Sequence, residues 1–141
     1  MNQINCTEEV ERFSTNVKTY DKAEQWRKIK DIIEIAKYLK PGTMVVLEST
    51  TYPGTTEELI KPILEDGSGL KCGEDFYLGF SPERVDPGNL IYKTKNTPKV
   101  VGAIGKDAAE VISEMYKAVL DGEVHTVSSP AVAEMEKILE N

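Results

Sequence analysis

The chain has 141 residues, of which 40% are hydrophobic and 29% are charged, a size and composition typical of one globular domain rather than of a disordered or fibrous protein. Its net charge is −7 and its basic residues are interspersed with acidic ones, which argues against a nucleic-acid partner. The short apolar runs and the N-terminal sequence MNQINCTEEVERF indicate neither a membrane span nor a secretion signal, so we expect a cytoplasmic protein.

The first part of the chain predicts a helix followed by a strand. Residues 1–20 show no clear period and predict no element. In residues 23–39, apolar side chains recur at steps of three and four, which predicts an amphipathic helix that ends at the KPG sequence of residues 40–42. The next segment, TMVVLES, holds four adjacent apolar residues. That run predicts a strand of a parallel sheet, covered on both faces.

A second helix is expected after the TTYPG sequence of residues 50–54. Thr55 and Glu58 have the spacing of a capping box, in which each side chain accepts a hydrogen bond from an amide of the first helical turn. Pro62 lies inside this helix and lacks an amide hydrogen. We therefore expect a kink or an early break at Pro62.

The rest of the chain predicts three more strands and two more helices. DFYLGFS, PKVVGAIG and EVHTVS are the strands. Residues 106–120 form a helix that Gly122 should close, with one apolar stripe made of Val111, Ile112, Met115, Tyr116 and Val119. Ser129 should cap the last helix, with Pro130 as its first residue.

This alternation of strands and helices predicts a layered α/β fold. Ligands of open α/β sheets bind outside the carboxyl ends of the strands. Three polar segments occupy such ends here: ESTTYPG, SPERVDPGN and VSSPAVAEM. We expect a ligand site where they meet.

Within SPERVDPGN, a carboxylate is followed by a guanidinium group. Glu83 could act as a general base or orient a water molecule, or it could simply be a turn residue paired with Arg84. Arg84 offers a planar fork that suits phosphate or carboxylate, but an arginine in a solvated turn needs no ligand.

Hydroxyl, imidazole and sulfur groups elsewhere leave similar alternatives. Ser49, Thr50 and Thr51 could bind a ligand, although their spacing favours capping of the next turn. His125 is the single histidine, and a structural role is favoured over catalysis. Cys6 and Cys72 belong to no metal-binding or disulfide pattern, so we expect free thiols and no metal site.

The last helix separates polar from apolar residues. Glu134, Lys137 and Asn141 should share one face, and Val132, Met135 and Leu139 another. Lys137 and Asn141 could together hold an oxyanion. The alternative, favoured by spacing alone, is a solvated face with a Glu134–Lys137 ion pair.

Four stretches of the sequence resemble the middle of the UDP-glucose/GDP-mannose dehydrogenase family, closest to the branch that oxidises UDP-N-acetylhexosamines. They are LKPGTMVVLESTTYPGTTEELIKPILE, SGLKCGEDFYLGFSPERVDPGN, NTPKVVGAIG and VSSPAVAEMEKILEN, and they span residues 32–141. The resemblance implies the second half of a Rossmann-like parallel sheet with flanking helices in residues 1–128, and the start of a central helix in residues 129–141. It also implies a role in polysaccharide biosynthesis.

The family's enzymes oxidise C6 of a UDP-sugar from alcohol to acid with two NAD molecules in succession, through a cysteine-bound intermediate. By this resemblance Ser49 and Thr50 contact the cofactor, and Glu83 lies near the hydrolytic water. Lys137 is the catalytic lysine and Asn141 assists it. The loop against the substrate comprises Arg84, Val85 and Asp86.

The chain also departs from the family's pattern. It contains no G-x-G-x-x-G turn, and Cys72, in LKCGED, is not in the glycine-rich setting of the family's nucleophile. We therefore expect a truncated product or middle segment that is inactive alone, while the intact enzyme is a homo-oligomer. Pro87 stands where another branch has a second acid, which favours the N-acetylhexosamine branch. The alternative is a non-catalytic α/β module that self-associates or docks on a partner through an exposed strand edge.

Overall fold

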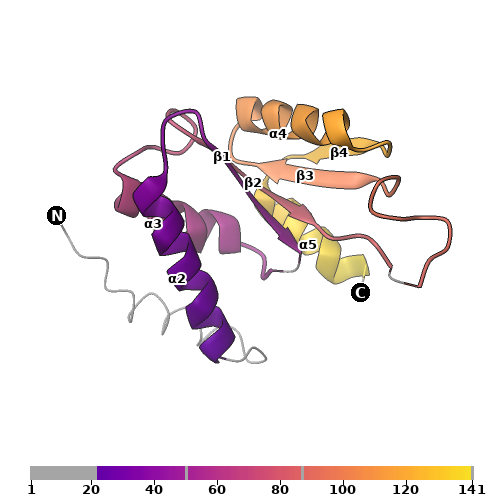
Figure 1. Cartoon of the computed structure of the whole chain (residues 1–141), viewed down its shortest axis with the longest axis horizontal. Helices are drawn as coiled ribbons and strands as arrows, with labels where there is room; N and C mark the ends of the chain where they lie inside the picture. The colour runs from indigo at the N-terminus through magenta and orange to yellow at the C-terminus, as the bar shows by residue number, and fades with distance from the viewer. Residues whose placement is uncertain (1–21, 50, 87, 141) are drawn as a thin grey trace.

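The computed structural model describes residues 22–49, 51–86 and 88–140 (Figure 1). The elements follow the predicted order and confirm the α/β class. They are α2 (Lys22–Tyr38), β1 (Met44–Ser49), η1 (Thr55–Ile60), α3 (Lys61–Ser68), β2 (Tyr77–Pro82), β3 (Lys99–Ala103), α4 (Lys106–Val119), β4 (Val124–Val127) and α5 (Pro130–Glu140). In these described residues, no helix combines the length and the apolarity that crossing a membrane requires.

The four strands form one open sheet in the order β1-β2-β3-β4. The β1–β2 and β3–β4 pairs are parallel, as predicted, but β2 and β3 are antiparallel, so the sheet is mixed. No helix is present between β2 and β3 in the described residues to carry the chain back across the sheet. A parallel neighbour requires such a crossover, so β3 returns in the opposite direction.

The reversal at β3 changes which strand ends share an edge. β1 and β2 both end at one edge, where Ser49 lies opposite Pro82. β3 and β4 end at the other edge, so the expectation that VSSPAVAEM begins beside the other two polar segments is wrong. The helix α5 then runs back along β2 and β3 and brings its later residues to the first edge.

Helices cover both faces of the sheet (Figure 1). On one face, α4 packs through Ala108, Ile112 and Tyr116 against Val101 and Ala103 of β3. On the other, α5 packs through Ala133 against Phe80 and Val100, beside a larger cluster in which α2, η1 and α3 cover Leu78. These alternating side chains give three layers with apolar contacts between them.

Three details differ from the predictions for buried elements. The apolar residues of β1 are only half-buried, because β1 is an edge strand within the described part of the chain. On α4, Ile112 and Tyr116 are buried, whereas Val111 and Val119 lie outside the stripe and are exposed. The helix ends in extended backbone at Leu120 rather than in a glycine cap.

The second helix begins where predicted but without the capping box. Gly54, with φ 92°, is the N-cap, and the Thr55 hydroxyl donates to the carbonyl of Tyr52. The first six residues form the π-helix η1, and α3 begins at Lys61. Pro62 therefore lies in the first turn of α3, where its missing amide hydrogen costs little, and the predicted interruption takes the form of this π-to-α change.

Candidate functional site

The segments after β1 and β2 lie side by side. Ser49 is the register partner of Pro82, and the amide of Glu83 donates to the Ser49 carbonyl at 3.4 Å. The sequence therefore places two of its three polar segments together, as predicted. The helix α5 contacts both of these segments.

Ser49 ends β1 in an unusual conformation. Its φ is 78°, and within the described ranges it is the single non-glycine residue with a positive φ. A serine held in the left-handed region costs about 1 kcal/mol or more, and such strained backbone clusters at functional sites. Its side chain is exposed at the edge of the sheet. Thr50, the other residue predicted to contact the cofactor, lies outside the described residues.

Two carboxylates of the loop after β2 accept hydrogen bonds from backbone amides of the same loop. The Glu83 carboxylate accepts a hydrogen bond from the Val85 amide at 2.8 Å, and Asp86 accepts one from the Gly88 amide at 3.1 Å. Glu83 and Val85 are half-buried, and Asp86 is exposed. Glu83 is thus not paired with Arg84, the structural alternative that the sequence allowed, and keeps one carboxylate oxygen for other partners.

Arg84 connects the loop to α5. One terminal nitrogen lies 2.6 Å from the carboxylate of Glu140, and the other lies 3.6 Å from that of Glu136. The Arg84 Nε and the Glu136 Oε2 are buried, and neither has a hydrogen-bond partner among the described residues. Buried polar atoms are seldom left unsatisfied, so this contact retains unused hydrogen-bonding capacity at the candidate substrate loop.

Glu134 fastens α5 to the segment after β1. Its side chain is fully buried, and its Oε2 accepts a hydrogen bond from the Gly54 amide at 2.7 Å. Its Oε1 accepts hydrogen bonds from the Thr56 amide at 3.0 Å, the Thr56 hydroxyl at 2.6 Å and the Thr51 hydroxyl at 3.2 Å. Neither the predicted Glu134–Lys137 ion pair nor the solvated position of Glu134 is found in the described residues.

The favoured alternative for α5, a solvated polar face, is therefore wrong. Ala133 and Glu134 are buried against the sheet and η1, whereas the apolar face points to solvent. Lys137 follows Glu134 by three residues and is half-buried, with no hydrogen-bond or ion-pair partner among the described residues. Asn141, its predicted companion, lies outside them. The exposed apolar residues are Val132, Met135, Ile138 and Leu139.

A second polar cluster lies on the α4 side of the same edge. The Tyr116 hydroxyl donates to Glu48, whose carboxylate also lies 3.3 Å from the Lys99 ammonium. Burial and the Glu48 carboxylate raise the pKa of Tyr116. The apolar stripe on α4 marked Tyr116 as a core residue, but nothing in the sequence pairs it with Glu48.

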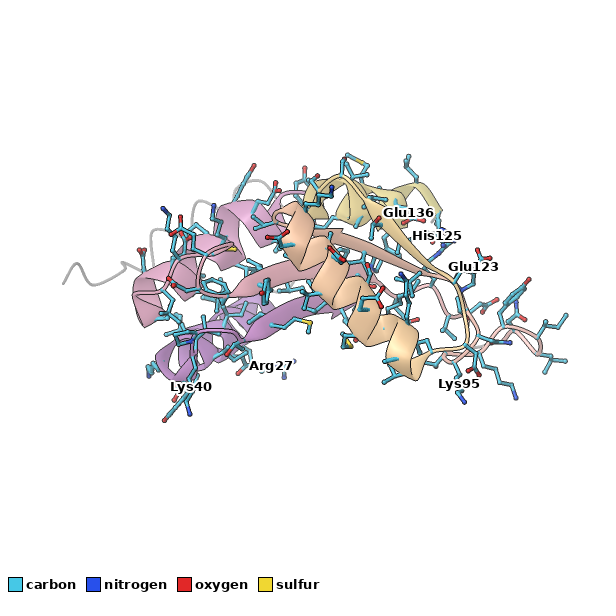
Figure 2. The ribbon with its side chains drawn as sticks, turned by 90° about the horizontal axis from the view of Figure 1, so that it is seen from above. Arg27, Lys40, Lys95, Glu123, His125 and Glu136 are labelled. Atoms are coloured by element: carbon cyan, nitrogen blue, oxygen red, sulfur yellow. The ribbon has the colours of Figure 1, made fainter. Side chains whose placement is uncertain are left out.

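The remaining candidate groups are a histidine and two cysteines. His125 is exposed on β4, and its Nε2 is 3.3 Å from Glu123 (Figure 2). Cys72 is a free thiol, as predicted, and burial raises its pKa, which disfavours a thiolate nucleophile. Cys6 lies outside the described residues, among which no cluster of metal-binding side chains occurs.

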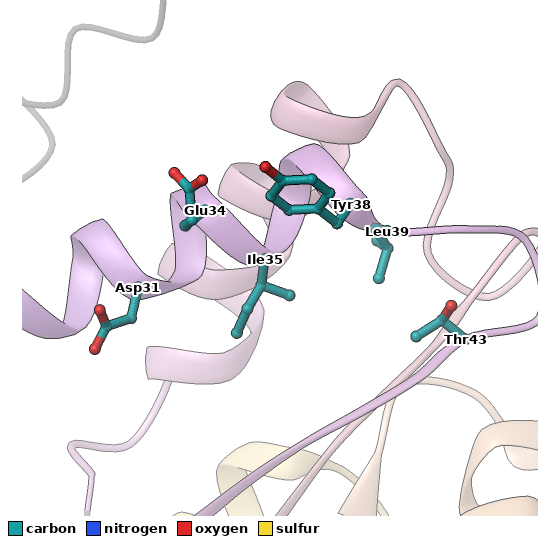
Figure 3. A pocket seen from close by; sticks show the side chains of 6 residues that line it. All are labelled: Asp31, Glu34, Ile35, Tyr38, Leu39 and Thr43. Atoms are coloured by element: carbon teal, nitrogen blue, oxygen red, sulfur yellow. The ribbon is translucent and has the colours of Figure 1, made fainter.

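A shallow pocket of about 440 Å³ lies between α2 and the turn into β1 (Figure 3). Thr43, at its rim, precedes the first residue of β1, so the pocket lies at the amino end of that strand. Ser49 is at the opposite end. The pocket is thus not part of the candidate site, and it is lined by Asp31, Glu34, Ile35, Tyr38, Leu39 and Thr43.

Comparison with known proteins shows which proteins this chain is similar to. Residues 14–120 match the model of the NAD-binding domain of the UDP-glucose/GDP-mannose dehydrogenase family. Protein CapL of Staphylococcus aureus is 44% identical over 107 residues, which are 76% of this chain and 25% of that protein. UDP-N-acetyl-D-glucosamine 6-dehydrogenase of Pseudomonas aeruginosa is 42% identical over the same shares of the two chains.

A solved structure shares the fold. The NDP-N-acetyl-D-galactosaminuronic acid dehydrogenase of Methanosarcina mazei Go1 superimposes with a TM-score of 0.74 at 45% identity, over 81% of this chain and 24% of that one. The fold is thus that of the Rossmann-like dehydrogenases. The chain spans about a quarter of the length of the curated relatives named above.

Proposed function

The chain belongs to the UDP-glucose/GDP-mannose dehydrogenase family, and from this membership we propose that it forms one wall of the active site of an NAD-dependent UDP-sugar 6-dehydrogenase. The observation that carries the proposal is the joining of three segments at one sheet edge. The Glu83 amide donates to the Ser49 carbonyl, and the Arg84 side chain is paired with Glu140. The Glu134 carboxylate accepts a hydrogen bond from Gly54, in the segment after β1.

NAD is the cofactor of the matched domain, and the residues present fit part of its site. Ser49, strained and exposed at the carboxyl end of β1, lies where open α/β sheets bind ligands, and Thr50 follows it. The phosphate-binding turn is not in the sequence, so this chain would contact the end of the cofactor near the sugar. Bound NAD supplies the oxidant.

The roles proposed for the side chains follow the positions of their charges. Arg84, with Val85 and Asp86, lies against the substrate, where its planar guanidinium suits a phosphate oxygen. Glu83 uses its free carboxylate oxygen to orient the hydrolytic water. Lys137, which has no partner in the described residues, holds the developing oxyanion with Asn141.

The proposed substrate is a UDP-N-acetylhexosamine. The relatives with printed activities include the UDP-N-acetyl-D-glucosamine 6-dehydrogenase of P. aeruginosa and a UDP-N-acetyl-D-mannosamine dehydrogenase of Pyrococcus horikoshii. Pro87 removes the second acid found in another branch, which also favours this sugar class. Comparing the affinities of the chain for different UDP-N-acetylhexosamines decides which hexosamine it binds best.

Calorimetric titration of the chain with UDP-N-acetylmannosamine tests this proposal. Arg84→Ala should weaken binding by about tenfold to a hundredfold, because a charge-assisted hydrogen bond contributes roughly 1.5–3 kcal/mol. Lys95→Ala is the matched control, since Lys95 is an exposed cation of the same β2–β3 connection that is paired with Asp121 rather than with α5. Equal affinities for the Arg84 and Lys95 variants would count against the proposed substrate loop.

We further propose that the chain alone does not turn over. The family's glycine-flanked nucleophile has no counterpart around Cys72, and without that thiol the covalent step has no attacking group. Incubation with NAD and UDP-N-acetylmannosamine should therefore yield no NADH above the rate of a protein-free blank. Sustained NADH production by the purified chain would refute this part of the proposal.

A further inference from the structure

We propose that Glu134 is a positioning residue for the site, an inference that rests on the proposed function. It sets the segment after β1 against α5, and so fixes the distance between the end of β1 and Lys137. The residues involved are far apart in the sequence: Glu134 is 83 positions from Thr51 and 78 from Thr56. No local element of either segment holds them together.

The stereochemistry demands a carboxylate at this position. The Gly54 amide and the Thr56 amide can only donate, and they point at different oxygens of Glu134. A glutamine can place its carbonyl oxygen on one amide, but its NH₂ group then meets the other donor. An aspartate is shorter by one methylene and cannot reach both. Glu134 thus replaces the cap that Thr55 and Glu58 do not form.

A cap alone would not require a buried anion from another element. Burying a carboxylate is unfavourable, and Glu134 has no ion-pair partner among the described residues, so its four hydrogen bonds must offset the loss of hydration. A serine or aspartate on the loop itself would satisfy the same amides at lower cost. What the long-range arrangement adds is a fixed spatial relation between the loop and α5.

That relation passes through the proposed catalytic groups. Thr51 directly follows Ser49 and Thr50, and Lys137 lies one helical turn beyond Glu134 on α5. Further along the same helix, Glu140 holds Arg84. Shifting Glu134 would therefore move residues 49–51, which are proposed to contact the cofactor, relative to both Lys137 and the substrate loop.

The test uses the complete 141-residue chain labelled with ¹⁵N, the variant Glu134→Gln and two controls. Thr56→Ser keeps every hydrogen bond, and Glu114→Gln removes an exposed carboxylate from α4. Glu134→Gln should speed amide exchange at Gly54 and Thr56 about tenfold and lower the affinity for UDP-N-acetylmannosamine about tenfold. Exchange at Leu78 and Val101, in the core, should not change. The Glu114→Gln control should match wild type, and Thr56→Ser, which loses one buried methyl group, should keep the wild-type affinity.

A second variant guards against loss of folding. Thr56→Val removes only the hydroxyl donor to Glu134, so it should shift exchange at Gly54 and the affinity in the same direction by a smaller factor. Uniformly faster exchange throughout the core in both variants would overturn the inference, because Glu134 would then only stabilise the fold.

The result also separates this inference from the proposed function. If wild type and Glu134→Gln bind UDP-N-acetylmannosamine with equal affinity, the positioning role is contradicted and the proposed function is not. A wild-type chain that binds no UDP-sugar contradicts the proposed function, and the inference falls with its premise.

Discussion

Tyr116 lies where α4 meets the end of β1, and its hydroxyl donates to Glu48. Burial and this carboxylate raise the pKa of Tyr116 above its ordinary value of 10.0, so the folded state retains the proton that the unfolded state loses first. The stabilisation is complete below that value and declines as the pH rises above it. Stability should therefore fall in alkaline solution.

Denaturant titrations of wild type and Tyr116→Phe at about pH 8 and about pH 11 measure this effect. The wild-type free energy of unfolding should drop more over this range than that of the variant, which has no phenol at this position. Equal drops for the two proteins would mean that Tyr116 keeps its ordinary pKa in the fold.

At the residue scale, the sequence predicted the positions of residues along strands and helices better than it predicted which side chains contact each other. Ser49 and Glu83 were placed at adjacent strand ends because parallel pairing follows from the strand pattern. The partners of Glu134 and Arg84 were missed, because helical spacing relates a side chain only to neighbours three or four positions away. Glu134 contacts residues about 80 positions earlier, and no period encodes such a contact.

At the scale of elements, the start of α5 lies close against β3, at the edge of the sheet opposite the site. A Cβ added at Gly102 would lie 2.2 Å from the Ser129 carbonyl oxygen, whereas one at Gly79 would meet the flexible end of Ile112 at 2.6 Å. Gly102→Ala should therefore destabilise the protein by about 3 kcal/mol or more, and Gly79→Ala by less. Gly88→Ala is the control, because a Cβ there would meet only the Asp86 carboxylate at 3.6 Å, an ordinary van der Waals contact.

Thermal unfolding of the three glycine variants, followed by circular dichroism, checks this ranking. Because the Gly102 contact fixes where α5 starts, its variant should also bind UDP-N-acetylmannosamine more weakly than the Gly79 variant. A Gly102 variant as stable as the Gly88 control would show that α5 can move away from β3 without loss.

The start of α5 is the element boundary that the sequence predicted most fully. The Ser129 hydroxyl accepts a hydrogen bond from the Val132 amide at 3.3 Å, and Pro130 is the first helical residue. Ser129→Ala should cost about 1 kcal/mol, as for other N-caps, whereas Ser129→Asn should cost little. Urea titration compares the two, and an alanine variant with wild-type stability would exclude the cap.

Element identities followed from local pattern, whereas the direction of β3 did not. Periodicity and turn residues report on a few neighbouring positions, so helices and strands were predicted in the right order. The antiparallel β2–β3 pair depends on the missing crossover in the connection between them, and the exposed apolar face of α5 depends on what lies against it. Neither is a local property.

At the scale of the whole molecule, we propose that the chain self-associates through the exposed apolar face of α5 rather than through the strand edge expected from the sequence. Ile138 is 45% exposed and Leu139 is 79% exposed, and burying such side chains against a second copy would contribute roughly 25 cal/mol per Å². Sedimentation velocity should show a concentration-dependent dimer that Leu139→Lys weakens. Val119→Lys, on the exposed side of α4, should leave the dimer intact, and a wild-type monomer at every concentration would contradict the proposal.

The central claim is that the ends of β1 and β2 and the second half of α5 form one UDP-sugar site. The direct measurement is a map of amide chemical-shift changes in the ¹⁵N-labelled chain during titration with UDP-N-acetylmannosamine. The account predicts that the largest changes fall together on Ser49, Thr51, Glu83, Arg84 and Lys137. Changes confined to the α2 pocket or scattered over the α4 face, with none at Ser49, Glu83 and Lys137, would contradict it.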